Sequence, residues 1–347
     1  MTTRNQTLAA SLLLLLGATA AGCAAEVTGG VPPEGDDDVP DGEDQPIPTT
    51  LTGKYAMTSE FDLATNMPGT AGQVVNIFVL ATDDPDDPTH YIVDKLVDAL
   101  PDGSIKTNLR NAVPFVSGYL NDRLLDWAPE LLTRVVALGN GFGQITKHFG
   151  MLETLDIPAS GTATKEVTGL HFKVDQTELD FLFADYGMDP IKVEGVAVSL
   201  AATGKVTIGE HKMPLSYGKA LRLGLDQVII PMIDPSATNV ADLLHGAVNC
   251  TAVGQYVYEA VGFGSPSTFA SACNSGLTGA SGLIYRQIDN LDGAALEFTI
   301  NGVARGVDKN KDGAMDDLQT GSWAGNLSYA GTPAPLAEGA KFFGKRM

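Results

Sequence analysis

The chain has 347 residues, of which 44% are hydrophobic, and a formal net charge of −20 at pH 7. Such an acidic chain repels the phosphates of nucleic acids and of anionic lipid headgroups, so the sequence predicts neither as a partner without a bridging metal ion. The length and apolar content are sufficient for one large folded domain.

The first residues have the pattern of an export signal. Arg4 lies in a short polar head, and an apolar stretch from Leu8 to Ala20 follows it. This stretch is shorter than the about 20 apolar residues that a membrane-spanning helix needs, and small residues follow it, as in a cleaved signal peptide. The sequence therefore predicts that residues 1–22 are a signal peptide, which is removed on export.

The junction Ala20-Ala21-Gly22-Cys23 resembles the bacterial lipobox, the cleavage site of bacterial lipoproteins. In that family the cysteine carries a diacylglycerol thioether, which implies at least two fatty acyl chains, such as palmitate, on Cys23 and stable attachment to a membrane. The family usually has Leu where this chain has Ala20, and secretion after an Ala-x-Ala-like site, without lipid, is the alternative. Ala24 in place of Asp favours the outer membrane, at its periplasmic face or at the cell surface.

An acidic spacer follows the cysteine. Residues 24–50 contain eight acids, no base and several Pro and Gly residues. This composition does not offset the entropy lost on ordering, so residues 23–50 are predicted to be the lipidated cysteine and a disordered tether. Flexible-coil scaling gives the tether a mean reach of about 30 Å. Residues 51–347, with 34 acids and 21 bases, form the predicted single domain.

The folded region begins with a predicted strand over residues 51–63. Apolar residues at helical spacing follow over 89–100 and again over 113–138. Pro114 and Pro129 interrupt the second of these stripes. The sequence therefore predicts a kinked helix, or two helices that meet near Pro129.

The spacing of apolar residues changes to two from about residue 161. In TGLHFKVD, residues 168–175, alternation predicts that Thr168, Leu170, Phe172 and Val174 face one side of a strand. Similar alternation continues through several short segments and ends with Leu221, Leu223 and Leu225. One-sided burial with short turns predicts an antiparallel meander.

Residues 237–289 return to helical spacing and contain Cys250 and Cys273. In an oxidising compartment these two cysteines are most simply a disulfide, which would join two helices, and two buried thiols are the alternative. Two more strands are predicted over 293–306 and 321–331. Strands at both ends and in the middle, with two helical blocks between them, predict an α+β domain in which a curved antiparallel β-sheet, open or barrel-like, packs on amphipathic helices.

The segment DKNKDGAMDD, residues 308–317, joins the last two predicted strands and resembles the D-x-[DN]-x-D-G calcium loop of EF-hands and several extracellular repeats. The resemblance implies a structural Ca²⁺ site in which side-chain or backbone oxygens come from Asp308, Asn310, Asp312, Ala314, Asp316 and Gln319. Gln319 departs from the family, which has a bidentate Glu there. An Asp- and Gly-rich hairpin turn is the alternative.

Recognisable catalytic motifs are missing from the sequence, which has no G-x-S-x-G and no H-E-x-x-H. GNGFG, residues 139–143, follows a predicted helix and reads as a helix end rather than a phosphate loop. Each histidine, including His211, is predicted to have a solvated or capping role. The sequence thus predicts a non-catalytic envelope lipoprotein that binds an apolar molecule between sheet and helices. A structural or adhesion role with an envelope protein as partner is the alternative, and a hydrolase is less supported.

Overall fold

The structure is a computed structural model of the chain. It describes residues 46–69, 71–72, 107, 129–174, 177–262 and 264–347. The predicted helix over 89–100 and the part of the second stripe before Pro129 lie outside these residues, as do the predicted signal peptide and Cys23.

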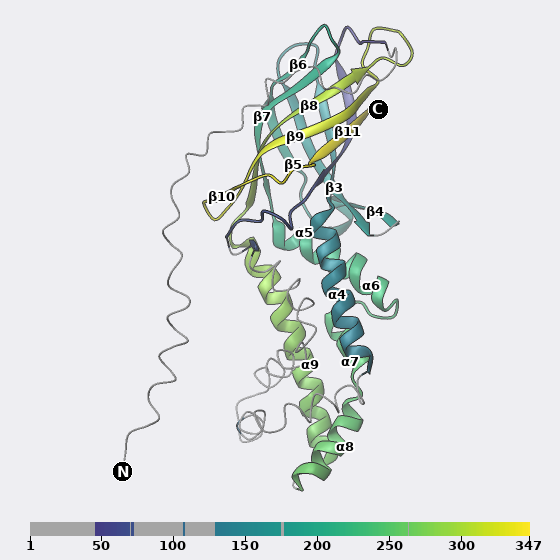
Figure 1. Ribbon diagram of the computed structural model, residues 1–347, viewed down its shortest axis with the longest axis vertical. Helices are drawn as coiled ribbons and strands as arrows, with labels where there is room; N and C mark the ends of the chain where they lie inside the picture. Colours follow the sequence, from purple (N-terminus) through teal and green to yellow (C-terminus); the bar gives the residue numbers. More distant parts are fainter. Residues whose placement is uncertain (1–45, 70, 73–106, 108–128, 175–176, 263) are drawn as a thin grey trace, which may run out of the picture. The chain divides into compact units, whose positions relative to one another are not determined.

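The strands of the described residues form one antiparallel sheet, as predicted (Figure 1). They are β1 (Gly53–Phe61), β2 (Phe149–Ile157), β3 (Ala163–Val174), β4 (Thr177–Leu182), β5 (Ile191–Val196), β6 (Val198–Leu200), β7 (Lys205–Leu215), β8 (Leu296–Val307), β9 (Asp317–Tyr329), β10 (Thr332–Pro335) and β11 (Lys341–Arg346). Their order is β4-β3-β2-β1-β11-β9-β8-β7-β6, with β5 on β3 and β10 on β9. The first and last strands, β1 and β11, are therefore neighbours.

The sheet is curved, and its path is open because β4 and β6 form its two ends. Burial alternates along each long strand, so one face forms a protected interior. In β1, for example, Tyr55, Met57, Ser59 and Phe61 are buried, and the residues between them are at least partly exposed. The α+β prediction with a curved antiparallel sheet is confirmed.

The helices follow the two helical blocks of the sequence. They are α4 (Pro129–Lys147), α5 (Tyr217–Gly224), a π-helical turn (Leu225–Ile229), α6 (Ile230–Ile233), α7 (Val240–Ala247), α8 (Cys250–Val261) and α9 (Pro266–Asp289), with 3₁₀ turns at Phe183–Tyr186 and Asn290–Gly293. The residues just before Pro129 lie outside the described ranges, so the predicted interruption at Pro129 stays a prediction. Asn239, Asn249 and Ser265 cap α7, α8 and α9 by accepting a hydrogen bond from a backbone N–H of the first turn.

Two predictions of secondary structure are wrong. Leu221, Leu223 and Leu225 do not lie in a strand but in α5 and the π-helical turn, and all three are buried because this helix is enclosed on several sides. A Cβ on Gly224 would lie 2.6 Å from Ile145 Cδ1 and 3.1 Å from Phe172 Cζ, so α5 packs directly on α4 and β3. Residues 139–143 do not end a helix, because α4 continues through them to Lys147.

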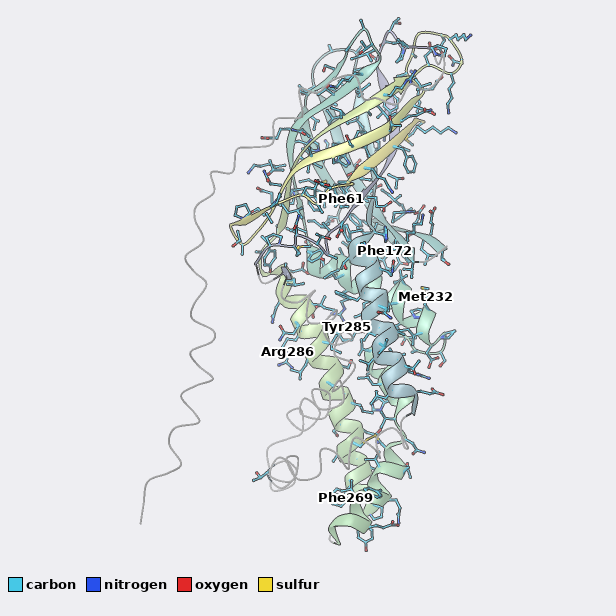
Figure 2. The ribbon with its side chains drawn as sticks, in the orientation of Figure 1. Phe61, Phe172, Met232, Phe269, Tyr285 and Arg286 are labelled. Atoms are coloured by element: carbon cyan, nitrogen blue, oxygen red, sulfur yellow. A yellow bond between two sulfur atoms is a disulfide. The ribbon has the colours of Figure 1, made fainter. Side chains whose placement is uncertain are left out.

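The sheet interior and the helices share one apolar core. Phe149 contacts Phe172 and Tyr217, with ring centroids 6.1 Å and 6.2 Å apart, and so links β2 to β3 and to α5. Figure 2 shows Phe61 at the sheet and Phe269 near the far end of α9.

Among the helices that the structure describes, none is long and apolar enough to cross a membrane.

Candidate functional site

Five side chains from five strands meet inside the sheet. They are Ser59 of β1, Glu153 of β2, Lys165 of β3, His211 of β7 and Trp323 of β9, and we call them the interior cage. Lys165 and Ser59 are fully buried and Glu153 is 2% exposed. A buried charge is costly unless it is paired, so the contacts within this group decide what it does.

Irregularities in the strand pairing turn the two basic members of the cage inward. The register of β2 and β3 shifts at Thr168, which is an extra residue in β3 and reverses the alternation so that Lys165 is buried. The register of β7 and β8 shifts just before His211 and buries it in the same way. Bulges of this kind re-aim side chains. Two predictions are therefore wrong, because Thr168 does not share the inner face with Leu170 and His211 is not solvated.

Hydrogen bonds and one ion pair join the five side chains of the cage in one series. Trp323 Nε1–H donates to Ser59 Oγ at 3.0 Å, and the Ser59 hydroxyl donates to Glu153 Oε2 at 2.7 Å. Lys165 Nζ lies 3.1 Å from Glu153 Oε1, an ion pair without hydrogen-bond alignment, and 3.3 Å from His211 Nε2. His211 Nδ1 lies 2.9 Å from the carbonyl oxygen of Gly209. The neutral tautomer with its proton on Nδ1 fits both contacts of the ring.

These contacts indicate that the interior cage stabilises the sheet. The Lys165 ammonium faces a carboxylate, an imidazole nitrogen and, at 4.1 Å from its centroid, the Trp323 ring, so it is satisfied on three sides. Burial lowers the pKa of Lys165, and the charge of Glu153 opposes that shift. A nucleophilic lysine needs a path for its substrate, and Lys165 is fully buried.

The position of His211 predicts that acid destabilises the fold. Burial, together with the charge of Lys165, lowers the pKa of His211 to about 4. The unfolded chain, in which histidine titrates near its ordinary value of about 6.5, therefore binds more protons between those two pH values, and stability falls as pH falls through that window. From pH 7 to pH 5 the contribution to the free energy of unfolding should fall by about 2 kcal/mol.

Urea denaturation at pH 7 and at pH 5 measures this loss. His211→Gln, which keeps an acceptor for Lys165 but does not titrate, serves as the comparison, because the other acids and histidines of the chain remain in both proteins. The wild type should lose more stability than this variant between the two pH values. Equal losses would show that His211 does not stay neutral in the fold.

The loop from Asp308 to Asp316 has the hydrogen bonds of a tight turn. Asp308 is buried and accepts from the backbone N–H groups of Asp312 and Gly313 at 3.2 Å and 2.8 Å. Asp316 accepts from the N–H groups of Lys309 and Asn310. These contacts match the alternative, an Asp- and Gly-rich hairpin turn.

The predicted calcium ligands are only partly brought together. Asp308, Asn310, Asp312 and Asp316 lie in this one loop, and Asp312 accepts from the N–H of Ala314. Gln319 lies in β9, where its amide nitrogen donates to Asp317. Within the described ranges, no group of three or more His, Cys, Asp or Glu side chains is arranged to hold a metal ion. The Ca²⁺ site therefore stays a prediction.

Residues 46–50, which the sequence assigns to the tether, bond to this loop. The N–H of Asp308 donates to the carbonyl of Pro46 at 3.0 Å, and the N–H groups of Thr49 and Thr50 donate to the carbonyl of Gly313. The chain therefore enters the folded domain beside the loop from Asp308 to Asp316.

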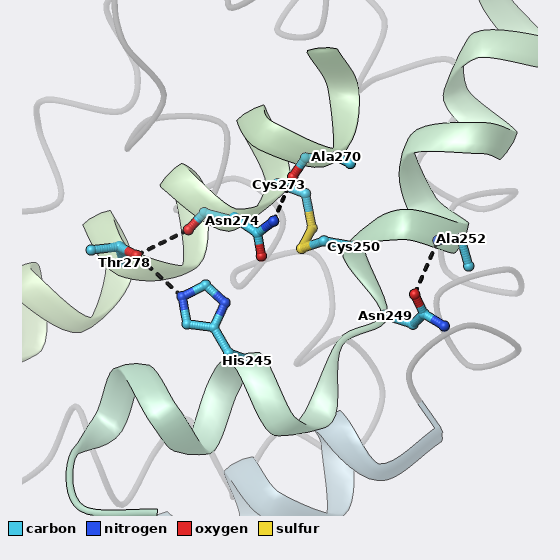
Figure 3. The surroundings of a disulfide bond; sticks show 8 residues. All are labelled: His245, Asn249, Cys250, Ala252, Ala270, Cys273, Asn274 and Thr278. Atoms are coloured by element: carbon cyan, nitrogen blue, oxygen red, sulfur yellow. Dashed lines mark hydrogen bonds between the residues drawn. A yellow bond between two sulfur atoms is a disulfide. The ribbon is translucent and has the colours of Figure 1, made fainter. Parts of the chain in front are cut away.

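The predicted disulfide between Cys250 and Cys273 is present and joins the start of α8 to α9 (Figure 3). The two Cα atoms are 5.6 Å apart, and Cys250 is buried.

An open groove of about 920 Å³ lies beside the disulfide, lined by His245 of α7 and by small or uncharged polar side chains of α8 and α9. His245 Nε2 lies 3.2 Å from Thr278 Oγ1 across this groove. We call this the polar groove.

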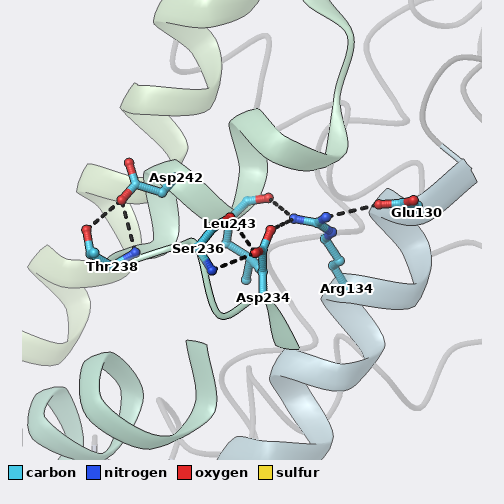
Figure 4. A network of polar contacts seen from close by, with 7 residues as sticks. All are labelled: Glu130, Arg134, Asp234, Ser236, Thr238, Asp242 and Leu243. Carbon is cyan, nitrogen blue, oxygen red and sulfur yellow. Dashed lines mark hydrogen bonds and ion pairs between the residues drawn. The ribbon is translucent and has the colours of Figure 1, made fainter. Parts of the chain in front are cut away.

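A network of polar contacts fixes α4 against the segment before α7 (Figure 4). Arg134 donates to Asp234 at 2.7 Å, to the carbonyl of Leu243 at 3.2 Å and to Glu130 at 3.0 Å. Asp234 also accepts from Ser236, and these hydrogen bonds, with that of Arg134, lower the pKa of Asp234. The contacts hold α4 in place beside α6 and α7.

A second open groove, of about 960 Å³, lies between α4 and α6, and we call it the glycine groove. Gly139, Gly141 and Gly143 of α4 line one side, and Ile229, Met232 and Ile233 line the other. Met232 is 48% exposed on the outer side of α6 (Figure 2).

Two glycines of α4 shape this groove in different ways. A Cβ on Gly141 would lie 2.8 Å from Ile229, so this glycine lets the π-helical turn before α6 approach α4. A Cβ on Gly143 would meet no atom within 4 Å, so the space above Gly143 is open. Glu130 and Arg134, at one end of the groove, are paired with each other. Lys147, at the other end, is exposed and has no ion-pair partner among the residues that the structure describes.

Sequence reasoning missed both the interior cage and the glycine groove. One signal was available, because Glu153 occupies an inward position among Phe149, Met151, Leu155 and Ile157 in a strand that otherwise alternates regularly. An acid at such a position indicates a buried partner.

Comparison of the chain with protein-family models, with curated proteins and with solved structures finds no match. The function is therefore inferred from the residues of the chain itself.

Proposed function

We propose that this chain is a non-catalytic lipoprotein of the bacterial cell envelope, anchored through Cys23, that binds an apolar small molecule or lipid in the glycine groove. The observation that carries the proposal is the open space above Gly143 opposite an apolar wall. Grooves that combine apolar walls with a few polar groups are the usual binding sites for small molecules.

The chemistry of the groove suits an amphiphile with an anionic head. Ile229 and Ile233 offer aliphatic surface, and Met232 is a flexible apolar side chain that adapts to ligands of different shape. Exposed Lys147 lies at the end of the groove that lacks a paired charge, where it would face an anionic group. The apolar tail would then lie along α4.

The sequence predicts a ligand between the sheet and the helices. Part of that space is filled, because Gly224 of α5 lies directly against Ile145 and Phe172. The glycine groove lies between α4 and α6, and Val174 at the end of β3 also lines it.

Two features support export to the envelope. The residues before Cys23 match the pattern of a lipoprotein signal peptide apart from Ala20. The disulfide between Cys250 and Cys273 is of the kind that persists in oxidising compartments. We propose the outer membrane as the location, because Ala24 rather than Asp follows the lipidated cysteine.

Gly143→Leu should weaken ligand binding at least tenfold without unfolding the protein. The new side chain would occupy the open space of the groove, and replacing a glycine inside a helix stabilises the helix by up to about 1 kcal/mol. Gly282→Leu on α9 is a matched control, because Gly282 is also helical and its Cβ would also meet no atom within 4 Å.

Two measurements check this prediction: mass spectrometry of lipids extracted from the purified proteins, and titration with a fluorescent fatty acid. The wild type and Gly282→Leu should carry lipid and bind the probe, and Gly143→Leu should bind at least tenfold more weakly. A wild type that carries no lipid and shows no saturable binding contradicts the proposal. So does a pair of variants that behave alike.

A structural or adhesion role remains the competing proposal, and the polar groove is the observation that favours it. Its serine, threonine, asparagine and glutamine side chains provide neutral hydrogen-bonding groups on the surface of α8 and α9. Cross-linking in cells that traps one defined envelope protein at Ser271 or Ser275, together with an empty glycine groove, would favour this role.

A further inference from the structure

We infer that the end of the sheet at which the chain enters the folded domain is a binding surface for the anionic headgroups of a membrane. We call this surface the entry end. It comprises residues 46–54, 156–164, 199–207, 305–317 and 345–346. The inference deepens the proposed function and rests on its membrane anchor.

Strand register brings basic residues from distant parts of the sequence to the entry end. Lys205 pairs with Arg305 across β7 and β8. Arg346 pairs with Tyr55 across β1 and β11, and its N–H donates to the carbonyl of Asp316. The basic residues of the entry end are Lys54, Lys205, Arg305, Lys309, Lys311, Lys345 and Arg346.

The charge of the entry end is opposite in sign to that of the rest of the domain. It holds seven bases and five acids, whereas the remainder of residues 51–347 holds 14 bases and 29 acids. All of these bases except Arg305 are exposed. Of its acids only Asp156 and Asp312 are exposed, because Asp308 and Asp317 are buried and Asp316 is half-buried.

Several of the exposed bases are free to bind an anion. Lys54, Lys205 and Lys345 have no ion-pair partner in the part of the chain that the structure describes, whereas Lys309 pairs with Asp317. Each exposed lysine close to an anionic lipid surface strengthens the binding of the protein to that surface. This effect extends over about one Debye length.

The segment that leads to Cys23 joins the folded domain at the entry end, which favours a lipid surface as the partner. Pro46, which bonds to Asp308, is the first described residue, and 22 residues separate it from Cys23. A lipid on Cys23 would therefore keep the membrane within reach of this end rather than of α8 and α9. Ile47, 46% exposed, adds an apolar side chain among the bases.

We expect this binding although the net charge of the whole chain is strongly negative. The net charge of −20 describes the whole chain, but binding at a surface depends on the charges within a Debye length of it. Eight of the acids that outnumber the bases lie in residues 26–44, directly before the entry end, and the others lie mainly in the rest of the domain, so the test of binding uses the full chain, in which the eight acids are present.

Vesicle sedimentation tests the inference with the full chain carrying Cys23→Ser, which cannot take the lipid. This chain should bind vesicles of phosphatidylcholine and phosphatidylglycerol in a 70:30 ratio and should not bind phosphatidylcholine alone. Lys54→Glu/Lys205→Glu/Lys345→Glu should weaken that binding at least tenfold. Lys173→Glu/Lys192→Glu/Lys212→Glu is the matched control, because it changes the net charge equally at exposed lysines outside the entry end and should change binding less than twofold.

Three results would overturn the inference: no preference for phosphatidylglycerol, equal losses in the two triple variants, or equal affinity for a soluble DNA duplex. Circular dichroism of both variants confirms that they are folded. The tested chain has no lipid at position 23 and an unchanged glycine groove, so a negative result here concerns only the entry end. The lipid anchor is tested separately by the mass of the native amino terminus, and ligand binding is tested separately by Gly143→Leu.

Discussion

Replacing Lys165 by Met should lower the free energy of unfolding by about 3–5 kcal/mol, the usual cost of removing one partner of a buried ion pair. The Glu153 carboxylate would remain buried and would keep only the hydrogen bond from Ser59. His211 would lose the ammonium that faces its Nε2. Most of this loss of stability should come from leaving buried polar groups without partners, and less of it from losing the attraction between Lys165 and Glu153.

Two further variants separate this cause from loss of volume. Lys165→Met/Glu153→Gln removes both charges, keeps an acceptor for Ser59, and should be more stable than Lys165→Met alone. Lys212→Met breaks an exposed pair with Glu297, at 2.9 Å, and should cost at most about 1 kcal/mol. Urea denaturation followed by circular dichroism measures all three. If Lys165→Met cost no more than Lys212→Met, the interior cage would not hold the sheet together.

Removing the disulfide should lower the free energy of unfolding by about 3 kcal/mol, the chain-entropy value for a loop of this size. The two cysteines are separated by 23 positions, and the bond joins only α8 and α9. The loss of local stability should therefore be large in these two helices and small in the sheet.

Hydrogen exchange on Cys250→Ala/Cys273→Ala tests where the loss falls. Amides of α8 and α9 should exchange faster, and amides of β8 and β9 should be unchanged. The wild type treated with a reductant is the control for the alanine side chains, because it breaks the same bond with both sulfur atoms in place. An unchanged unfolding midpoint after reduction would contradict the prediction.

Much of the fold could be predicted from the sequence because long elements have strong periodicity. Leu296, Phe298 and Ile300 alternate in sequence and are all fully buried in β8. Helices α7, α8 and α9 begin at Asn or Ser residues that cap them. The disulfide followed from the number of cysteines left after Cys23.

The candidate sites could not be predicted, because each depends on contacts between distant segments. Lys165 and His211 are buried only because the register shifts beside them, and alternation alone would place both outside. Gly139 and Gly143 are in mid-helix because the tertiary packing of α4 overrides the low helix propensity of glycine. The bases of the entry end meet through strand register, which the sequence pattern does not specify.

The claim on which the account depends is that this protein works at a membrane. Mass spectrometry of the intact protein, extracted from the membranes of cells that produce it, tests the claim most directly. We expect a chain that begins at Cys23 and carries the added mass of at least two acyl chains on that residue. A protein recovered in the soluble fraction, with an unmodified amino terminus at another position, would contradict it.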